Sequence, residues 1–171
     1  MKKIFSLLLV LAITLSICGC SLKAEALDLN ETVTIGDYEV TITGTEFTYG
    51  WDPNTLVSFS NSKDGLIHFI IYYTVKNVGN SQITIPDGLF KVIYDDEYEF
   101  TAGESAYYYS YDVDSYVANG NVLPPLSKEI KCKKCIDISE QIKDDTEKPL
   151  KLEFKLKGEK YIIDLRAQNQ K

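Results

Sequence analysis

Two cysteines separated by two lysines, Cys132-Lys133-Lys134-Cys135, have the spacing with the clearest potential for chemistry. A C-x-x-C motif can be a redox pair or half of a zinc site, and basic neighbours favour the thiolates. The surrounding residues alternate as in a strand, however, where residues three apart point to opposite faces and lie about 10 Å apart. A disulfide requires Cα atoms within about 7 Å. We therefore expect structural thiols; a strained local disulfide and redox or metal work are the alternatives.

Other catalytic or metal-ligating side chains are scarce. His68 is the only histidine, and we interpret it as a packed or surface residue of a strand. The thiols at positions 132 and 135 lack zinc partners, because Cys20 is expected to carry lipid. No serine has a G-x-S-x-G context, and the only methionine is Met1, which argues against a copper carrier. We predict no enzyme activity, no metal centre and no cofactor.

An acidic, tyrosine-rich segment between Lys91 and Lys128 is the better candidate for binding. It contains no basic residue, seven carboxylates and seven of the 12 tyrosines. Tyrosine on loops gives rigid, amphipathic contact area, and carboxylates attract a basic partner or Ca²⁺. Three interpretations stay open: a solvated loop packed over the domain edge, a recognition surface for an envelope protein or glycan, and a calcium site at Asp112-x-Asp114. The candidate surface comprises Tyr107, Tyr108, Tyr109, Tyr111, Asp112, Asp114 and Tyr116.

The first 19 residues have the features of a lipoprotein signal peptide. Lys2-Lys3 precedes an apolar stretch, Ile4–Ile17, that is too short to span a membrane. The sequence Ile17-Cys18-Gly19-Cys20 resembles a bacterial lipobox, which implies cleavage after Gly19 and diacylglycerol on Cys20. Cys18 fits less well as the lipidated residue, and an ordinary secretory signal is the alternative. We expect a bilayer-anchored protein on the outer face of the cytoplasmic membrane, or on the outer membrane of a cell that has two.

The charge of the mature chain excludes one large class of partners. Removing Lys2 and Lys3 with the leader leaves 16 basic residues against 25 acidic ones, a formal charge of −9. Nucleic-acid binding needs clustered lysine and arginine to replace counterions. The same acidity keeps the domain from lying on anionic lipid, so the anchor must supply the membrane affinity.

Period-two alternation predicts an all-β domain organised around Gly65–Asn77, which is apolar on both faces and therefore central. Ala102–Asn121 is expected to be irregular, and Ser139 is a plausible cap for one helical turn. The pattern predicts an antiparallel, immunoglobulin-like β-sandwich of seven to nine strands. We divide the chain into a leader (1–19), a lipidated N-terminus and tether (20–30), the domain (31–166) and a tail (167–171). The other predicted strands are Thr32–Ile35, Tyr38–Phe47, Gln82–Ile85, Phe90–Tyr94, Tyr98–Thr101, Lys128–Ile138 and a hairpin beginning at Leu150.

The order of these features resembles the DUF4352, telokin-like family of bacterial exported lipoproteins. The matching pieces include the step Tyr72–Asn80 (YYTVKNVGN), which is similar to the strand–x–N–x–G step of the family. The resemblance covers roughly Glu31 to Arg166 and implies an immunoglobulin-like sandwich outside the cytoplasm. It brings no catalytic residues, because the family is defined by its fold. Further matches are Val33–Asp37, Val40–Ile42, Phe90–Asp95, Pro124-Pro125 and Cys135–Ile138.

These observations favour a lipid-anchored, non-catalytic binding domain whose partner is an envelope protein or glycan. Two alternatives belong to different classes. One is an extracytoplasmic thiol–disulfide protein that uses Cys132 and Cys135, and the other is a calcium-stabilised structural domain.

Overall fold

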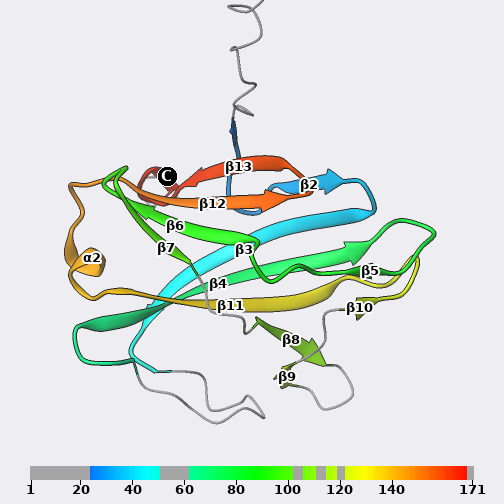
Figure 1. Cartoon of the computed structure of the whole chain (residues 1–171), viewed down its shortest axis with the longest axis horizontal. Helices are drawn as coiled ribbons and strands as arrows, with labels where there is room; N and C mark the ends of the chain where they lie inside the picture. Colours follow the sequence, from blue (N-terminus) through cyan, green and yellow to red (C-terminus); the bar gives the residue numbers. More distant parts are fainter. Residues whose placement is uncertain (1–23, 51–61, 102–105, 111–114, 119–121, 169–171) are drawn as a thin grey trace, which may run out of the picture.

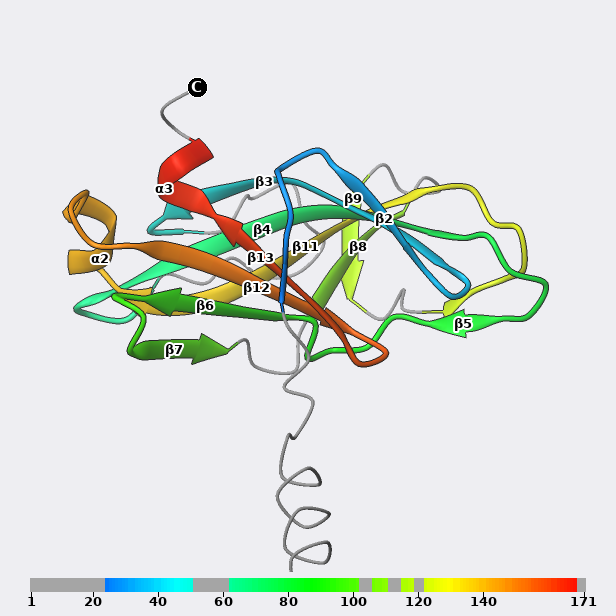
Figure 2. The ribbon, with the colours of Figure 1, turned by 90° about the horizontal axis from the view of Figure 1, so that it is seen from above.

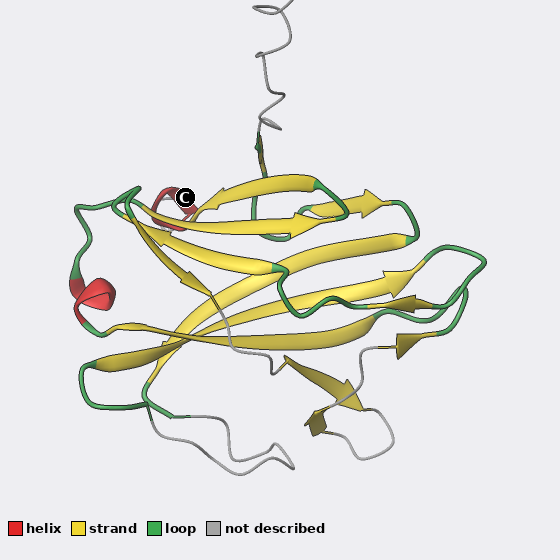
Figure 3. Ribbon diagram, viewed as in Figure 1, coloured by secondary structure: helices red, strands yellow, loops and turns green. Residues whose placement is uncertain are grey.

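The computed structural model describes residues 24–50, 62–101, 106–110, 115–118 and 122–168, and its strands form two stacked sheets (Figure 1). Seen from above, strands of one sheet cross over those of the other (Figure 2). Strands dominate the described part, with only two short helical turns (Figure 3). The predicted β-sandwich is therefore confirmed. No helix in these ranges is long and apolar enough to cross a membrane.

The smaller sheet has five strands in the order β1-β13-β12-β6-β7. β1 pairs in parallel with β13, and the other neighbours are antiparallel. β12 and β13 are the hairpin that the sequence predicted. The strands are β1 (Glu25–Ala26), β6 (Phe90–Tyr94), β7 (Tyr98–Thr101), β12 (Leu150–Leu156) and β13 (Glu159–Asp164).

The larger sheet has six antiparallel strands in the order β2-β3-β4-β11-β8-β9. A separate pair joins β5 (Ile83–Thr84) to β10 (Val122–Leu123). Two helical turns, α2 (Gln141–Asp144) and α3 (Leu165–Gln168), follow β11 and β13. The strands of this sheet are β2 (Thr32–Ile35), β3 (Tyr38–Thr48), β4 (Leu66–Asn77), β8 (Ala106–Ser110), β9 (Ser115–Ala118) and β11 (Ile130–Ser139).

The core lies between the sheets, and β4 supplies its centre as the alternation predicted. The inward residues of β4 are at most 2 % exposed, and they belong to one buried cluster with the inward residues of β12. Aromatic rings link the two layers: Tyr73 meets Phe90 edge-on at 4.9 Å, and Phe90 lies 5.6 Å from Phe154. Burial of such large side chains is the main stabilising term of the fold. The inward residues of β4 are Ile67, Phe69, Ile71, Tyr73 and Val75.

Several short or edge elements differ from the sequence prediction. The described residues form 13 strands rather than seven to nine, and the four that the sequence did not predict are β1, β8, β9 and β10. The segment predicted to be irregular contains the hairpin β8–β9, which pairs with β11. The predicted tether contributes β1. Ser139 is not the cap of α2; Glu140 takes that position, without a side-chain hydrogen bond.

The turn after β4 explains the N-x-G step of the sequence. The side chain of Asn77 is fully buried, and its amide group donates to the carbonyls of Ser81 (2.8 Å), Leu123 (3.1 Å) and Pro124 (2.9 Å). Its oxygen accepts from the backbone N–H of Gly79 at 3.0 Å. A Cβ on Gly79 would lie 2.2 Å from Cγ of Asp37. Both residues therefore have structural roles at this turn.

Candidate functional site

The thiols of Cys132 and Cys135 lie on opposite faces of β11. The strand pairs with β4 without a register shift from Ile130 to Ser139, so the three-residue spacing reverses the side chain. Cys132 is 1 % exposed in the core, whereas Cys135 is half-buried on the outer face, and both carry thiols. Burial raises the pKa of the Cys132 thiol well above its usual range. The fold thus does not bring the two sulfurs together, as a dithiol function would require.

His68 has a charged partner that the sequence did not reveal. Its position in β4 is directly opposite Asp137 in β11, and both side chains lie on the outer face of the larger sheet. Nδ1 of His68 and Oδ1 of Asp137 are 2.6 Å apart. The histidine side chain is 5 % exposed and the carboxylate 47 % exposed. A buried ring therefore contacts a carboxylate that water can reach.

Cys135 completes a three-residue group with this pair. It precedes Asp137 by two positions, so its side chain shares the outer face. One ligand atom from each of Cys135, His68 and Asp137 lies within 4.8 Å of the others. Sulfur, nitrogen and oxygen donors thus converge, which is the chemistry of transition-metal sites and of thiol nucleophiles paired with histidine. The sequence analysis did not identify this group, because the register between β4 and β11 cannot be predicted from the sequence of either strand alone.

The lysines between the cysteines are both buried, one on each face of β11. Lys133 is 3 % exposed on the outer face, and Lys134 is 1 % exposed on the inner face. Nζ of Lys134 has no hydrogen-bond partner in the described part of the chain. Burial lowers the pKa of Lys134, and the charge of Asp87 opposes that shift. Lys134 is thus a buried amine without a hydrogen-bond partner among the described residues, and Asp87 and Cys135 are the charged groups that act on it.

The backbone of the tyrosine-rich segment is a hairpin at the end of the larger sheet. Tyr107, Tyr108 and Tyr109 belong to β8, and Tyr116 belongs to β9. β8 pairs with β11 through Cys132↔Tyr108 and two neighbouring positions, and β9 follows as the outermost strand. Three predicted surface residues, Tyr111, Asp112 and Asp114, lie outside the described residues, and with them the calcium interpretation.

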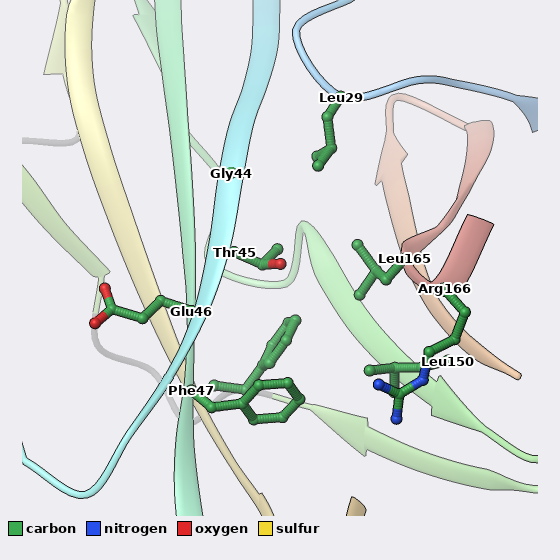
Figure 4. A pocket seen from close by; sticks show the side chains of 9 residues that line it. Leu29, Gly44, Thr45, Glu46, Phe47, Leu150, Leu165 and Arg166 are labelled. Atoms are coloured by element: carbon green, nitrogen blue, oxygen red, sulfur yellow. The ribbon is translucent and has the colours of Figure 1, made fainter. Parts of the chain in front are cut away.

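A pocket of about 270 Å³ opens where β3 passes the start of β12 and α3 (Figure 4). It begins at Gly44, just after the register shift in β3. Phe47, Leu150 and Leu165 make its wall apolar, and Arg166 lies at one side. One guanidinium nitrogen of Arg166 donates to the carbonyls of Ile142 and Asp145. Ligand pockets usually span about 300–1,000 Å³, so this one holds at most a small ligand.

The lipidation candidate Cys20 and its alternative Cys18 lie outside the described residues. The chain joins the sandwich soon afterwards. Glu25 and Ala26 pair with β13, and the N–H of Leu27 donates to the carbonyl of Ile162 at 3.0 Å. Leu27 is only 4 % exposed. The sheet thus extends into the predicted tether and leaves four residues between Cys20 and Glu25.

Comparisons with known proteins bear on the fold. No family model matches the chain, and no curated protein sequence matches it significantly. An uncharacterized β-sandwich protein of Clostridium difficile 630 is similar in structure, with a TM-score of 0.68 and 19 % identity over 84 % of this chain and 96 % of that chain. A conserved hypothetical protein of Bacillus anthracis has a TM-score of 0.52 and 14 % identity over 76 % and 89 %.

A third similar structure is a lipoprotein candidate of Bacillus subtilis, ycdA. Its TM-score is 0.45, with 14 % identity over 83 % of this chain and 39 % of that chain. The first two structures show the sandwich fold and nothing about activity or partners. The resemblance to the DUF4352 family stays a prediction.

Proposed function

We propose that this protein is a DUF4352-like bacterial lipoprotein, anchored to the outer face of the cytoplasmic membrane by a diacylglycerol group on Cys20. Its proposed role is to bind an envelope protein, without catalysis. The lipobox-like sequence Ile17–Cys20 supports the anchor. A short chain between Cys20 and β1 supports a position close to the bilayer, because four residues reach about 14 Å when extended. Two acyl chains give stable attachment.

The position of the hairpin β8–β9 is the main support for the proposed binding function. Figure 1 shows β1 (dark blue, at the top) and β8–β9 (at the bottom) on opposite sides of the sandwich. Each belongs to the end of a different sheet. With the lipid attached ahead of β1, the hairpin is directed away from the membrane, where a partner has access to it.

The hairpin combines an open sheet edge with a composition suited to recognition. β9 pairs only with β8 among the described strands. The outer edge of a terminal strand offers N–H and C=O groups to an added strand. The surrounding segment, from Lys91 to Lys128, has carboxylates and tyrosines but no basic residue. These features favour a protein that presents an extended, basic segment.

Cross-linking in intact cells followed by purification of the full-length protein tests this proposal. The double variant Tyr108→Ala/Tyr109→Ala in β8 should lose a cross-linked partner that the unmodified protein captures. The matched control is Tyr49→Ala, since Tyr49 is 49 % exposed and lies outside the segment from Lys91 to Lys128. This control should retain capture.

Equal capture by both variants would contradict a binding role for the hairpin. Loss in both, with unchanged melting temperatures, would place the contact on a wider surface and would likewise reject the hairpin as the site. Melting curves for each variant separate loss of contact from loss of folding.

A further inference from the structure

The group Cys135, His68 and Asp137 supports an inference that the proposed binding function does not use. We propose that these three side chains bind one transition-metal ion of the zinc class on the outer face of the larger sheet. The donors come from two directly paired strands, β4 and β11. Their positions are therefore set by the hydrogen-bonded ladder between the two middle strands of the larger sheet rather than by a loop.

The distances suit a tetrahedral ion with little rearrangement. With bonds of about 2.0–2.3 Å, the ligand atoms of such an ion lie about 3.3–3.8 Å apart. The three ligand atoms here already lie within 4.8 Å of one another. The 2.6 Å contact between His68 and Asp137 must lengthen by less than about 1 Å when the ion replaces the shared proton.

The donor set selects the class of metal. A thiolate, an imidazole and a carboxylate suit Zn²⁺ or Co²⁺, whereas Ca²⁺ and Mg²⁺ require oxygen ligands. Three protein ligands leave one position for water or another ligand, as in open zinc sites.

The buried histidine makes the proposed metal site rigid, and its two more exposed ligands make it accessible. The His68 ring is 5 % exposed, so packing limits its rotation. Asp137 is 47 % exposed and Cys135 is half-buried, which gives an ion a route from solvent. Cys132, three residues away, lies on the other face in the core and provides an internal control.

Titration with Co²⁺ tests the proposal, because a thiolate ligand produces a charge-transfer absorption band. The experiment uses the full-length chain in detergent, with Cys18 and Cys20 replaced by serine so that leader thiols do not contribute. We expect one Co²⁺ per chain with the thiolate band, displacement of Co²⁺ by Zn²⁺, and no displacement by Ca²⁺. Substitutions in the second shell of metal sites cost about 10–100-fold in affinity, so Cys135→Ser should cost more than about 100-fold.

The control variant Cys132→Ala should keep both the band and the affinity. A third variant, Asp137→Asn, changes the most exposed of the three proposed ligands and so avoids a substitution at a buried position. It should also weaken Co²⁺ binding. Equal Co²⁺ affinity in the unmodified protein and Cys135→Ser would overturn the proposal, as would loss of the band in Cys132→Ala but not in Cys135→Ser. Melting curves without metal confirm that each variant is folded.

Discussion

At the scale of single residues, the buried polar groups of this protein serve different purposes. Asn77 is fully satisfied and ties three chain segments together. Lys134 is equally buried, but its amine has no partner in the described structure. His68 and Asp137 satisfy each other on the outer face. A buried polar group whose hydrogen bonds are all made, such as Asn77, indicates a structural role. The convergence of sulfur, nitrogen and oxygen donors at Cys135 supports the proposed metal-binding site instead.

Replacing Asn77 by aspartate should destabilise the fold strongly. The carboxylate would face three carbonyl oxygens that now accept from the amide group, and it would be fully buried. We expect a loss of about 3 kcal/mol in the free energy of unfolding, measured by urea denaturation. Asn80→Asp, at an exposed position in the same turn, is the control and should change the free energy by less than about 0.5 kcal/mol. A similar cost in both variants would contradict the role of Asn77.

The buried thiol of Cys132 predicts a loss of stability at alkaline pH. Its pKa is raised in the folded state from an ordinary value of 9.0. The unfolded chain therefore releases this proton first, and the thiol's contribution to stability falls as pH rises above about 9. The fall approaches about 1.4 kcal/mol per pH unit for one proton.

Urea denaturation of the unmodified protein and of Cys132→Val between pH 7 and pH 10 isolates this effect. Lys134 lies on the same face, and its lowered pKa acts in the opposite direction, but it is present in both proteins. The difference in unfolding free energy between them should change steadily above pH 9 in favour of the valine variant. A constant difference across the range would show that the Cys132 thiol does not titrate as its burial implies.

At the scale of elements, strands with their own alternation pattern were predictable, whereas strands that depend on a distant partner were not. Thr32–Ile35, Phe90–Tyr94 and Tyr98–Thr101 match the predicted bounds, because alternation of buried and exposed residues is a local signal. β8 pairs with β11, which lies far from it in the sequence. The local composition of the β8–β9 segment therefore predicted an irregular structure. β1 is two residues long and exists only through β13.

The candidate site was predictable only in part. Opposite faces for Cys132 and Cys135 followed from strand geometry and are confirmed. The contact between His68 and Asp137 depends on the register of two strands that are about 60 residues apart, which no local pattern encodes. A sequence with one histidine therefore seemed to lack metal ligands.

The strand β1 should matter more than its length suggests. Leu27, directly after it, is 4 % exposed and belongs to the core. Leu27→Ala should lower the free energy of unfolding by about 2–4 kcal/mol, since truncation leaves a cavity. Glu25→Ala changes an exposed residue of the same strand and should cost little. Equal stability of Leu27→Ala and the unmodified protein in urea would show that this segment is not part of the domain.

At the scale of the whole molecule, the proposed attachment and the proposed binding surface lie on opposite sides of the sandwich. The chain enters beside β13, with four residues between Cys20 and β1, and the hairpin β8–β9 extends the other sheet on the opposite side. The outer face of that sheet carries the group of Cys135, His68 and Asp137. Attachment, recognition and metal binding would thus occupy separate surfaces of one domain.

The proposed anchor at Cys20 is the central claim, because it would set both the location of the protein and the orientation of the hairpin. Mass spectrometry of the N-terminal peptide of the protein isolated from bacterial membranes tests it most directly. The account predicts a peptide that begins at Cys20 and carries the mass of a diacylglyceryl group. A peptide that retains Met1 or Cys18, or one that begins elsewhere without lipid, would contradict it.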